Sequence, residues 1–92
     1  MVERVCLKVY VEGRVQGVFF RANTQAIAKQ LGVNGWVKNL TDGRVEMHLE
    51  GTYSSVGSLV AWALKGPRHA RVDRLIAVRV ECKDYAVFDI MY

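Results

Sequence analysis

The sequence predicts one α+β domain in which two helices cover a single face of a mixed, mainly antiparallel sheet. A chain of 92 residues is long enough for one domain with one core. The spacing of its apolar residues changes between two, typical of strands, and three to four, typical of helices. The resulting order is β-α-β-β-α-β with a further C-terminal strand. Because both helices need the same packed face of the sheet, the order predicts a two-layer sandwich of the split-βαβ type.

The first strand is predicted at residues 4–12 and is followed by a loop at residues 13–20. Gly13 and Gly17 allow the loop backbone to curl and to approach a ligand closely. Arg21 stands where the first helix begins, and a helix start has unpaired N–H groups and a partial positive charge. Because a guanidinium group also suits phosphate, the segment predicts a cradle for a phosphate-like group. The alternative is a turn that carries a surface charge.

The first helix is predicted at about residues 22–31, and Gly32 is placed to end it. Asn23 or Thr24 is expected to cap its start. Thr24 falls at a core-facing position, where a structural hydrogen bond is expected of it. A second strand follows at residues 34–39.

Asp42-Gly43 predicts a tight hairpin turn before a third strand at residues 44–50. Apolar and polar residues alternate strictly along this strand, which predicts a sheet with one packed face and one solvated face. The residues expected on the solvated face are Arg44, Glu46, His48 and Glu50. Glu46 and Glu50 are expected to pair with lysine or arginine on neighbouring strands.

The second helix is predicted at about residues 54–65, with Ser54 or Ser55 as its cap. The last two strands are predicted at residues 71–81 and 86–92. Internal repeats, low-complexity segments and composition shifts are absent from the sequence, so residues 1–92 are predicted to form a single domain.

The composition limits the classes of partner. The formal net charge of +4 fits a small anionic substrate as well as it fits a polyanion, and no basic tail stands out. Apolar runs fall well short of the ~20 residues of a membrane span. The first residues lead into a strand without the plan of a signal peptide. We therefore expect a cytoplasmic protein.

The two cysteines, Cys6 and Cys82, lie far apart in the sequence and lack metal-ligand spacing. In a reducing cytoplasm they are expected to be thiols. Cys6 lies out of phase with the apolar residues of its strand, whereas Cys82 lies in phase with those of its own. They are thus expected on opposite faces of the sheet, which argues against a disulfide.

Metal and nucleotide chemistry find little support in the sequence. His48 and His69 have no second ligand at a suitable spacing and are expected to be solvated. Carboxylates do not cluster as a magnesium site requires. The glycine loop also lacks the lysine and hydroxyl residue of a P-loop. We therefore expect no metal and no cofactor.

Asn39 ends the second strand just before the hairpin turn, and such an asparagine often bonds to nearby backbone. In a split-βαβ sheet, however, it can also reach the mouth of the loop at residues 13–20. One arginine, backbone amides and one asparagine can accelerate phosphoryl transfer by positioning and charge stabilisation. An amide is not a base, so the leaving group must be good without help. A carboxylate is such a group, which favours acyl phosphates as substrates.

Two motifs resemble the signatures of the acylphosphatase family. Residues 13–21, Gly-Arg-Val-Gln-Gly-Val-Phe-Phe-Arg, resemble the family's Gly-x-Val-Gln-Gly-Val-x-Phe-Arg. Residues 35–39, Gly-Trp-Val-Lys-Asn, with Gly43, Val45 and Gly51, resemble its second signature.

The resemblance implies a ferredoxin-like sandwich and hydrolysis of acyl phosphates without metal or cofactor. By resemblance, Arg21 binds the phosphate and Asn39 orients the attacking water. The phosphate-binding loop corresponds to Val15, Gln16, Gly17, Val18, Phe19 and Phe20, next to Arg21.

The expected partner is a small-molecule acyl phosphate, without specificity for the acyl part, and neither nucleic acid nor a membrane. We expect a monomer, since no exposed apolar stripe demands a partner. Two alternatives use the same fold. An RNA-binding module would place aromatic residues on the third strand, which here carries acids instead. A non-catalytic module would use the loop only to bind an anion.

Overall fold

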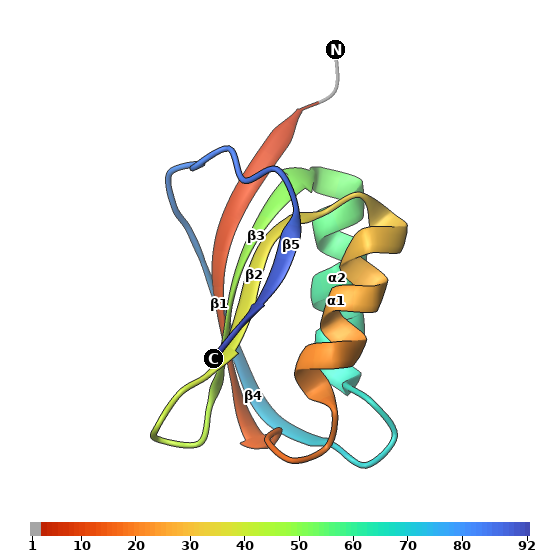
Figure 1. Ribbon diagram of the computed structural model, residues 1–92, viewed down its shortest axis with the longest axis vertical. Coiled ribbons are helices and arrows are strands. Elements are labelled where there is room, and N and C mark those ends of the chain that lie inside the picture. Colours follow the sequence, from red (N-terminus) through yellow and green to blue (C-terminus); the bar gives the residue numbers. More distant parts are fainter. Residues whose placement is uncertain (1–2) are drawn as a thin grey trace.

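The computed structural model describes residues 3–92 and has the predicted two-layer architecture, with both helices on one face of a five-stranded sheet (Figure 1). The elements are β1 (Arg4–Arg14), α1 (Phe20–Leu31), β2 (Asn34–Asn39), β3 (Val45–Thr52), α2 (Tyr53–Lys65), β4 (Arg71–Arg79) and β5 (Phe88–Met91). Their order confirms the predicted α+β fold with a C-terminal strand. No helix within residues 3–92 is long and apolar enough to cross a membrane.

The strands lie in the order β4-β1-β3-β2-β5, and only the β2–β5 pair is parallel. β1 is longer than predicted and extends to Arg14, with an irregularity between Glu12 and Gly13 where it pairs with β4. Gly13 has φ of 133°, and a Cβ there would collide with the backbone oxygen of Arg71. Gly13 therefore serves strand pairing, and the loop itself is shorter than the predicted residues 13–20.

The core lies between the sheet and the two helices, as the alternation predicts. The sheet contributes side chains such as Val9, Val11 and Met47, which are all inaccessible to solvent. From the helices, Phe20 packs against Trp62, with ring centroids 5.4 Å apart. This contact fixes the first residue of α1 against α2 and so holds the start of α1 in place.

The opposite face of the sheet was predicted to be solvated, and this prediction is wrong. Glu46, His48 and Glu50 are only 8%, 3% and 1% exposed. Glu46 lies beneath the side chains of Lys8 and Lys38. For His48 and Glu50 the reason is the connection at residues 80–87. It must cross from β4 to β5 at the opposite edge of the sheet, and it runs over the face that the helices leave open (Figure 1). The strand period shows which residues share a face and does not show what covers that face.

The acids on this face have the predicted kind of partner. Glu46 lies 3.4 Å from the ammonium group of Lys8 and 3.7 Å from that of Lys38. Glu50 lies 3.5 Å from the guanidinium group of Arg4. Cross-strand ion pairing therefore persists although the carboxylates are buried.

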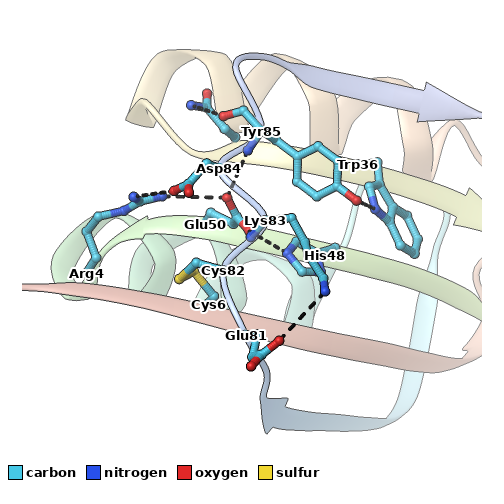
Figure 2. Close-up of polar contacts among 11 residues, drawn as sticks. Arg4, Cys6, Trp36, His48, Glu50, Glu81, Cys82, Lys83, Asp84 and Tyr85 are labelled. Carbon is cyan, nitrogen blue, oxygen red and sulfur yellow. Dashed lines mark hydrogen bonds and ion pairs between the residues drawn. A yellow bond between two sulfur atoms is a disulfide. The ribbon is translucent and has the colours of Figure 1, made fainter.

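The cysteines form a disulfide, Cys6–Cys82, contrary to the expectation of two free thiols (Figure 2). The error has a structural reason. β4 ends at Arg79, so the phase of Cys82 in a longer strand does not determine its side. The connection at residues 80–87 carries Cys82 over the face on which Cys6 and Glu50 are paired neighbours.

Both helix starts differ from the prediction. α1 begins at Phe20, so Asn23 and Thr24 lie inside its first turns and do not cap it. The buried Thr24 hydroxyl donates to the Phe20 carbonyl at 2.7 Å, which confirms its structural role. α2 is capped by Thr52, whose hydroxyl accepts from the Ser55 N–H at 3.0 Å, instead of by a serine.

Candidate active site

A cavity of about 260 Å³ lies where the first residues of α1 meet the ends of β2 and β5. Its lining residues are Gly17, Phe19, Phe20, Arg21, Ala22, Asn39, Ile90 and Tyr92. The structure thus brings together Arg21 and Asn39, which were predicted on separate elements. Of the seven residues predicted to bind phosphate, Gly17, Phe19, Phe20 and Arg21 line the cavity, and Val15, Gln16 and Val18 are not among its lining residues.

Those three residues hold the loop in place. Val15 and Val18 are buried in the core. Gln16 donates through Nε2 to the carbonyls of Leu40 at 2.8 Å and Arg44 at 3.0 Å, which ties the loop to the β2–β3 turn. The side chains therefore anchor the loop, and the tether from Gln16 ends beside Asn39, at the next residue of the turn.

Gly17 is the glycine whose backbone freedom the loop requires. Its φ is 74°, and a Cβ there would meet no atom within 4 Å. The position therefore selects glycine for its left-handed backbone and not for lack of space.

The start of α1 opens into the cavity, since Phe20, Arg21 and Ala22 are its first three residues. No side chain in residues 3–92 caps this end, and its first turn contains no acid. The Phe19 carbonyl accepts from the backbone N–H of Asn23 at 3.1 Å and from its Nδ2 at 2.9 Å. Uncapped N–H groups and a positive helix end together favour an anion in this cavity.

The Arg21 guanidinium group adds a full positive charge. Its central carbon lies 5.0 Å from the centroid of the Tyr92 ring, a cation–π contact. Among the described residues, no carboxylate forms an ion pair with Arg21, whereas Arg44 and Arg71 each pair with a nearby aspartate. The guanidinium group of Arg21 is therefore free to bind an anion.

Asn39 is the last residue of β2, and its side chain lines the cavity. Its Oδ1 atom is buried and has no hydrogen-bond partner within residues 3–92. The turn that follows is held by Asp42, which accepts from the Arg44 N–H at 3.1 Å, and by Gln16. An unpaired buried polar atom costs about 1–3 kcal/mol, so the free Oδ1 atom of Asn39 is available to a hydrogen-bond donor in the cavity.

The histidines lie outside the cavity. His69 is exposed, as expected. His48 was also expected to be solvated, but it is buried beneath residues 80–87 and its ring donates to Glu50 at 2.7 Å (Figure 2). The Cys6, Cys82 and Glu50 ligand atoms lie within 4.8 Å of one another, but the two sulfurs are joined in the disulfide.

Glu50 is the centre of this buried cluster, which is separate from the cavity (Figure 2). Burial opposes its ionisation, but hydrogen bonds from the Lys83 N–H, the His48 ring and the Tyr85 N–H outweigh burial. They hold the pKa of Glu50 below its ordinary value. The carboxylate thus binds the crossing segment at residues 80–87 to the sheet.

Ile90 and Tyr92 were not predicted at the site. They reach it because β5 pairs in parallel with β2, so that both strands end at the same edge of the sheet. From the sequence, Ile90 can be predicted only to share the packed face with Phe88. No sequence pattern places Tyr92 at the site.

Comparisons with known proteins agree with this architecture. The family model named Acylphosphatase matches residues 7–90. An acylphosphatase of Legionella pneumophila (strain Paris) is 42% identical over 91 residues, which cover 99% of this chain and 100% of that protein. A solved acylphosphatase from Coxiella burnetii superimposes with a TM-score of 0.92 at 38% identity, covering 96% of this chain and 93% of that one. A solved acylphosphatase from Bacillus subtilis superimposes with a TM-score of 0.93 at 34% identity, covering 96% of this chain and 99% of that one. The chain therefore belongs to the acylphosphatase family of enzymes.

Proposed function

We propose that this chain hydrolyses acyl phosphates to a carboxylate and inorganic phosphate. The observation that carries the proposal is the cavity in which Arg21, Asn39 and the uncapped start of α1 meet. Family membership supports the same reaction class.

In this proposal, Arg21 and the backbone N–H groups of residues 15–20 bind the phosphoryl group. Support comes from the free guanidinium group and from the left-handed backbone at Gly17 and Phe19, which turns the chain sharply at the cavity. The positive end of a helix and the planar set of guanidinium N–H donors suit the equatorial oxygens of a phosphoryl group during its transfer. Their contribution is electrostatic and is largest where charge develops in the transition state.

Asn39 orients the attacking water in this proposal. Asn39 lines the same cavity as Arg21, and its Oδ1 atom has no hydrogen-bond partner within the described chain. An amide positions a water without removing its proton, so the reaction depends on a leaving group that departs unaided. The carboxylate of an acyl phosphate, whose acid has a pKa of about 4, meets this condition and needs no Lewis acid.

The RNA-binding alternative gains no support. The sheet face that would stack bases is crossed by residues 80–87, and Tyr85 packs edge-on against His48 with ring centroids 5.2 Å apart. A cytoplasmic location and a monomeric state remain predictions.

The proposal is tested by hydrolysis of benzoyl phosphate in excess chelator. We expect release of benzoate and phosphate at a rate that added Mg²⁺ or Zn²⁺ does not increase. Absence of hydrolysis, or hydrolysis that returns only with metal, would contradict the proposal. A chain that binds phosphate but does not turn over would instead support the non-catalytic alternative.

A further inference from the structure

Phe19 stands out at the edge of the cavity. Its side chain is 77% exposed, although Val18 and Phe20 on either side of it are buried. Its φ of 61° and ψ of 26° place it in the left-handed region, which a bulky residue adopts rarely and at a cost. The two hydrogen bonds that Asn23 donates to the Phe19 carbonyl hold this conformation. A strained backbone that presents an aromatic ring at a cavity indicates a function for the ring.

A second apolar wall comes from β5. Ile90 and Tyr92 line the same cavity, and Tyr92 is 99% exposed. The Tyr92 ring lies against the guanidinium group of Arg21, beside the proposed phosphate position. Exposed apolar side chains that gather at a concave site indicate a ligand with an apolar part.

The two ends of a bound substrate would meet surroundings of different charge. Among the described residues that line it, Arg21 is the only charged one. Arg21 binds the phosphoryl group in the proposed reaction, so the acyl end meets no other charged side chain among the described lining residues. An acyl group that carries a carboxylate would find no second cationic side chain among the described residues of the remaining walls. An aromatic or branched aliphatic acyl group would cover apolar surface on Phe19 and Tyr92.

We infer that the cavity selects acyl phosphates with a bulky, uncharged, apolar acyl group, and that Phe19 and Tyr92 determine this preference. The inference rests on the proposed function and narrows the expectation of a site without acyl specificity. Contact with these apolar side chains should change kcat/KM by about tenfold between substrates, because one or two added apolar groups in an apolar pocket have an effect of this order.

The test compares acetyl phosphate with 3-phenylpropionyl phosphate, because the two carboxylates leave with nearly equal ease and differ mainly in apolar bulk. The quantity measured is the ratio of their kcat/KM values, which cancels changes in the phosphate cradle that affect both substrates. We expect the wild type to favour 3-phenylpropionyl phosphate about tenfold. In Phe19→Asn, which removes the ring but keeps a residue type that tolerates left-handed backbone, the ratio should fall toward one.

Tyr92→Ala is a second variant at an exposed terminal position, and the ratio should fall there too. Tyr53→Ala is the matched control, since Tyr53 is an exposed aromatic residue outside the cavity, and it should keep the wild-type ratio. A wild-type ratio near one, or a ratio that Phe19→Asn and Tyr92→Ala leave unchanged, would overturn the inference and leave the proposed function standing. Hydrolysis of neither substrate would overturn the proposed function, and the inference with it.

Discussion

Arg21 can bind an anion because no neighbouring carboxylate among the described residues occupies its guanidinium group. Arg44 is paired with Asp42 at 2.9 Å, whereas within residues 3–92 no carboxylate pairs with the guanidinium group of Arg21, which lies over the face of the Tyr92 ring. Its charge is therefore available to a ligand, and its position at the start of α1 adds the field of the helix.

Replacing Arg21 tests this reading directly. Arg21→Ala should weaken binding of inorganic phosphate and lower kcat/KM together, because the charge acts on both the bound and the reacting phosphoryl group. The loss should be about 2–4 kcal/mol, the scale of one preorganised donor. Arg21→Lys should recover only part of it, since an ammonium group lacks the planar fork. Arg74→Ala, which removes an exposed arginine outside the cavity, is the control. Equal phosphate affinity in Arg21→Ala and Arg74→Ala would contradict the role.

Glu50 carries a pH dependence of stability. Its pKa is held below the ordinary value of 4.5 in the folded chain by hydrogen bonds that outweigh burial. The unfolded chain therefore binds this proton more readily, so the stabilisation is complete above about pH 4.5 and is lost as the pH falls through the lower, folded pKa. Unfolding in guanidinium chloride across pH 7 to 3 should show the loss.

Glu50→Gln should lower the free energy of unfolding at pH 7 by about 2 kcal/mol, because the amide cannot accept all the hydrogen bonds of the carboxylate. The same variant should flatten the loss of stability at low pH. If Glu50→Gln loses stability with falling pH as steeply as the wild type, the pH dependence comes from other carboxylates. Examples are Asp42 and Asp73, whose pKa values are lowered by Arg44 and Arg71.

Among the elements, the connection at residues 80–87 contains no helix or strand, yet several bonds hold it to the sheet. The Cys6–Cys82 disulfide and the bonds to Glu50 fasten them to the sheet, and the indole N–H of Trp36 donates to the Tyr85 hydroxyl at 3.3 Å. This connection leads directly into β5. Ile90 within β5 and Tyr92 just after it form one wall of the cavity.

Reduction of the disulfide should lower the free energy of unfolding by about 4 kcal/mol, since it joins residues 76 apart and so restricts the unfolded chain strongly. The measurement is denaturant unfolding with and without a phosphine reductant. The double variant Cys6→Ser/Cys82→Ser should have the same free energy of unfolding as the reduced protein, and the reductant should not change it. Neither cysteine lines the cavity, so kcat of the folded, reduced protein should stay near the oxidised value. Identical unfolding with and without reductant would show that the disulfide contributes nothing.

For the whole molecule, the order of elements and the two-layer fold could be predicted because strands and helices differ in apolar period. The alternation of Val45, Met47 and Leu49 correctly placed one face against the helices. It failed for His48 and Glu50, because the path of residues 80–87 across the sheet leaves no periodic signal in the sequence. The disulfide was missed for the same reason.

The candidate site was predicted in part. The loop glycines, Arg21 and Asn39 carry recognisable residue types at recognisable places, and the structure brings Arg21 and Asn39 to one cavity. Two features could not be read from the sequence. A phenylalanine gives no sign that it will adopt left-handed backbone, as Phe19 does. Tyr92 joins the site only through the parallel pairing of β5 with β2, which is a property of the assembled sheet.

In the proposed reaction, Arg21 binds the phosphoryl group and Asn39 positions the water. The most direct test measures two quantities for Asn39→Ala, the affinity for inorganic phosphate and kcat with benzoyl phosphate. Asn34→Ala, at the other end of β2 and outside the cavity, is the matched control. We expect Asn39→Ala to bind phosphate like the wild type and to lose about 2–4 kcal/mol of transition-state stabilisation. Normal turnover in Asn39→Ala, or a loss of phosphate affinity as large as that of Arg21→Ala, would contradict it.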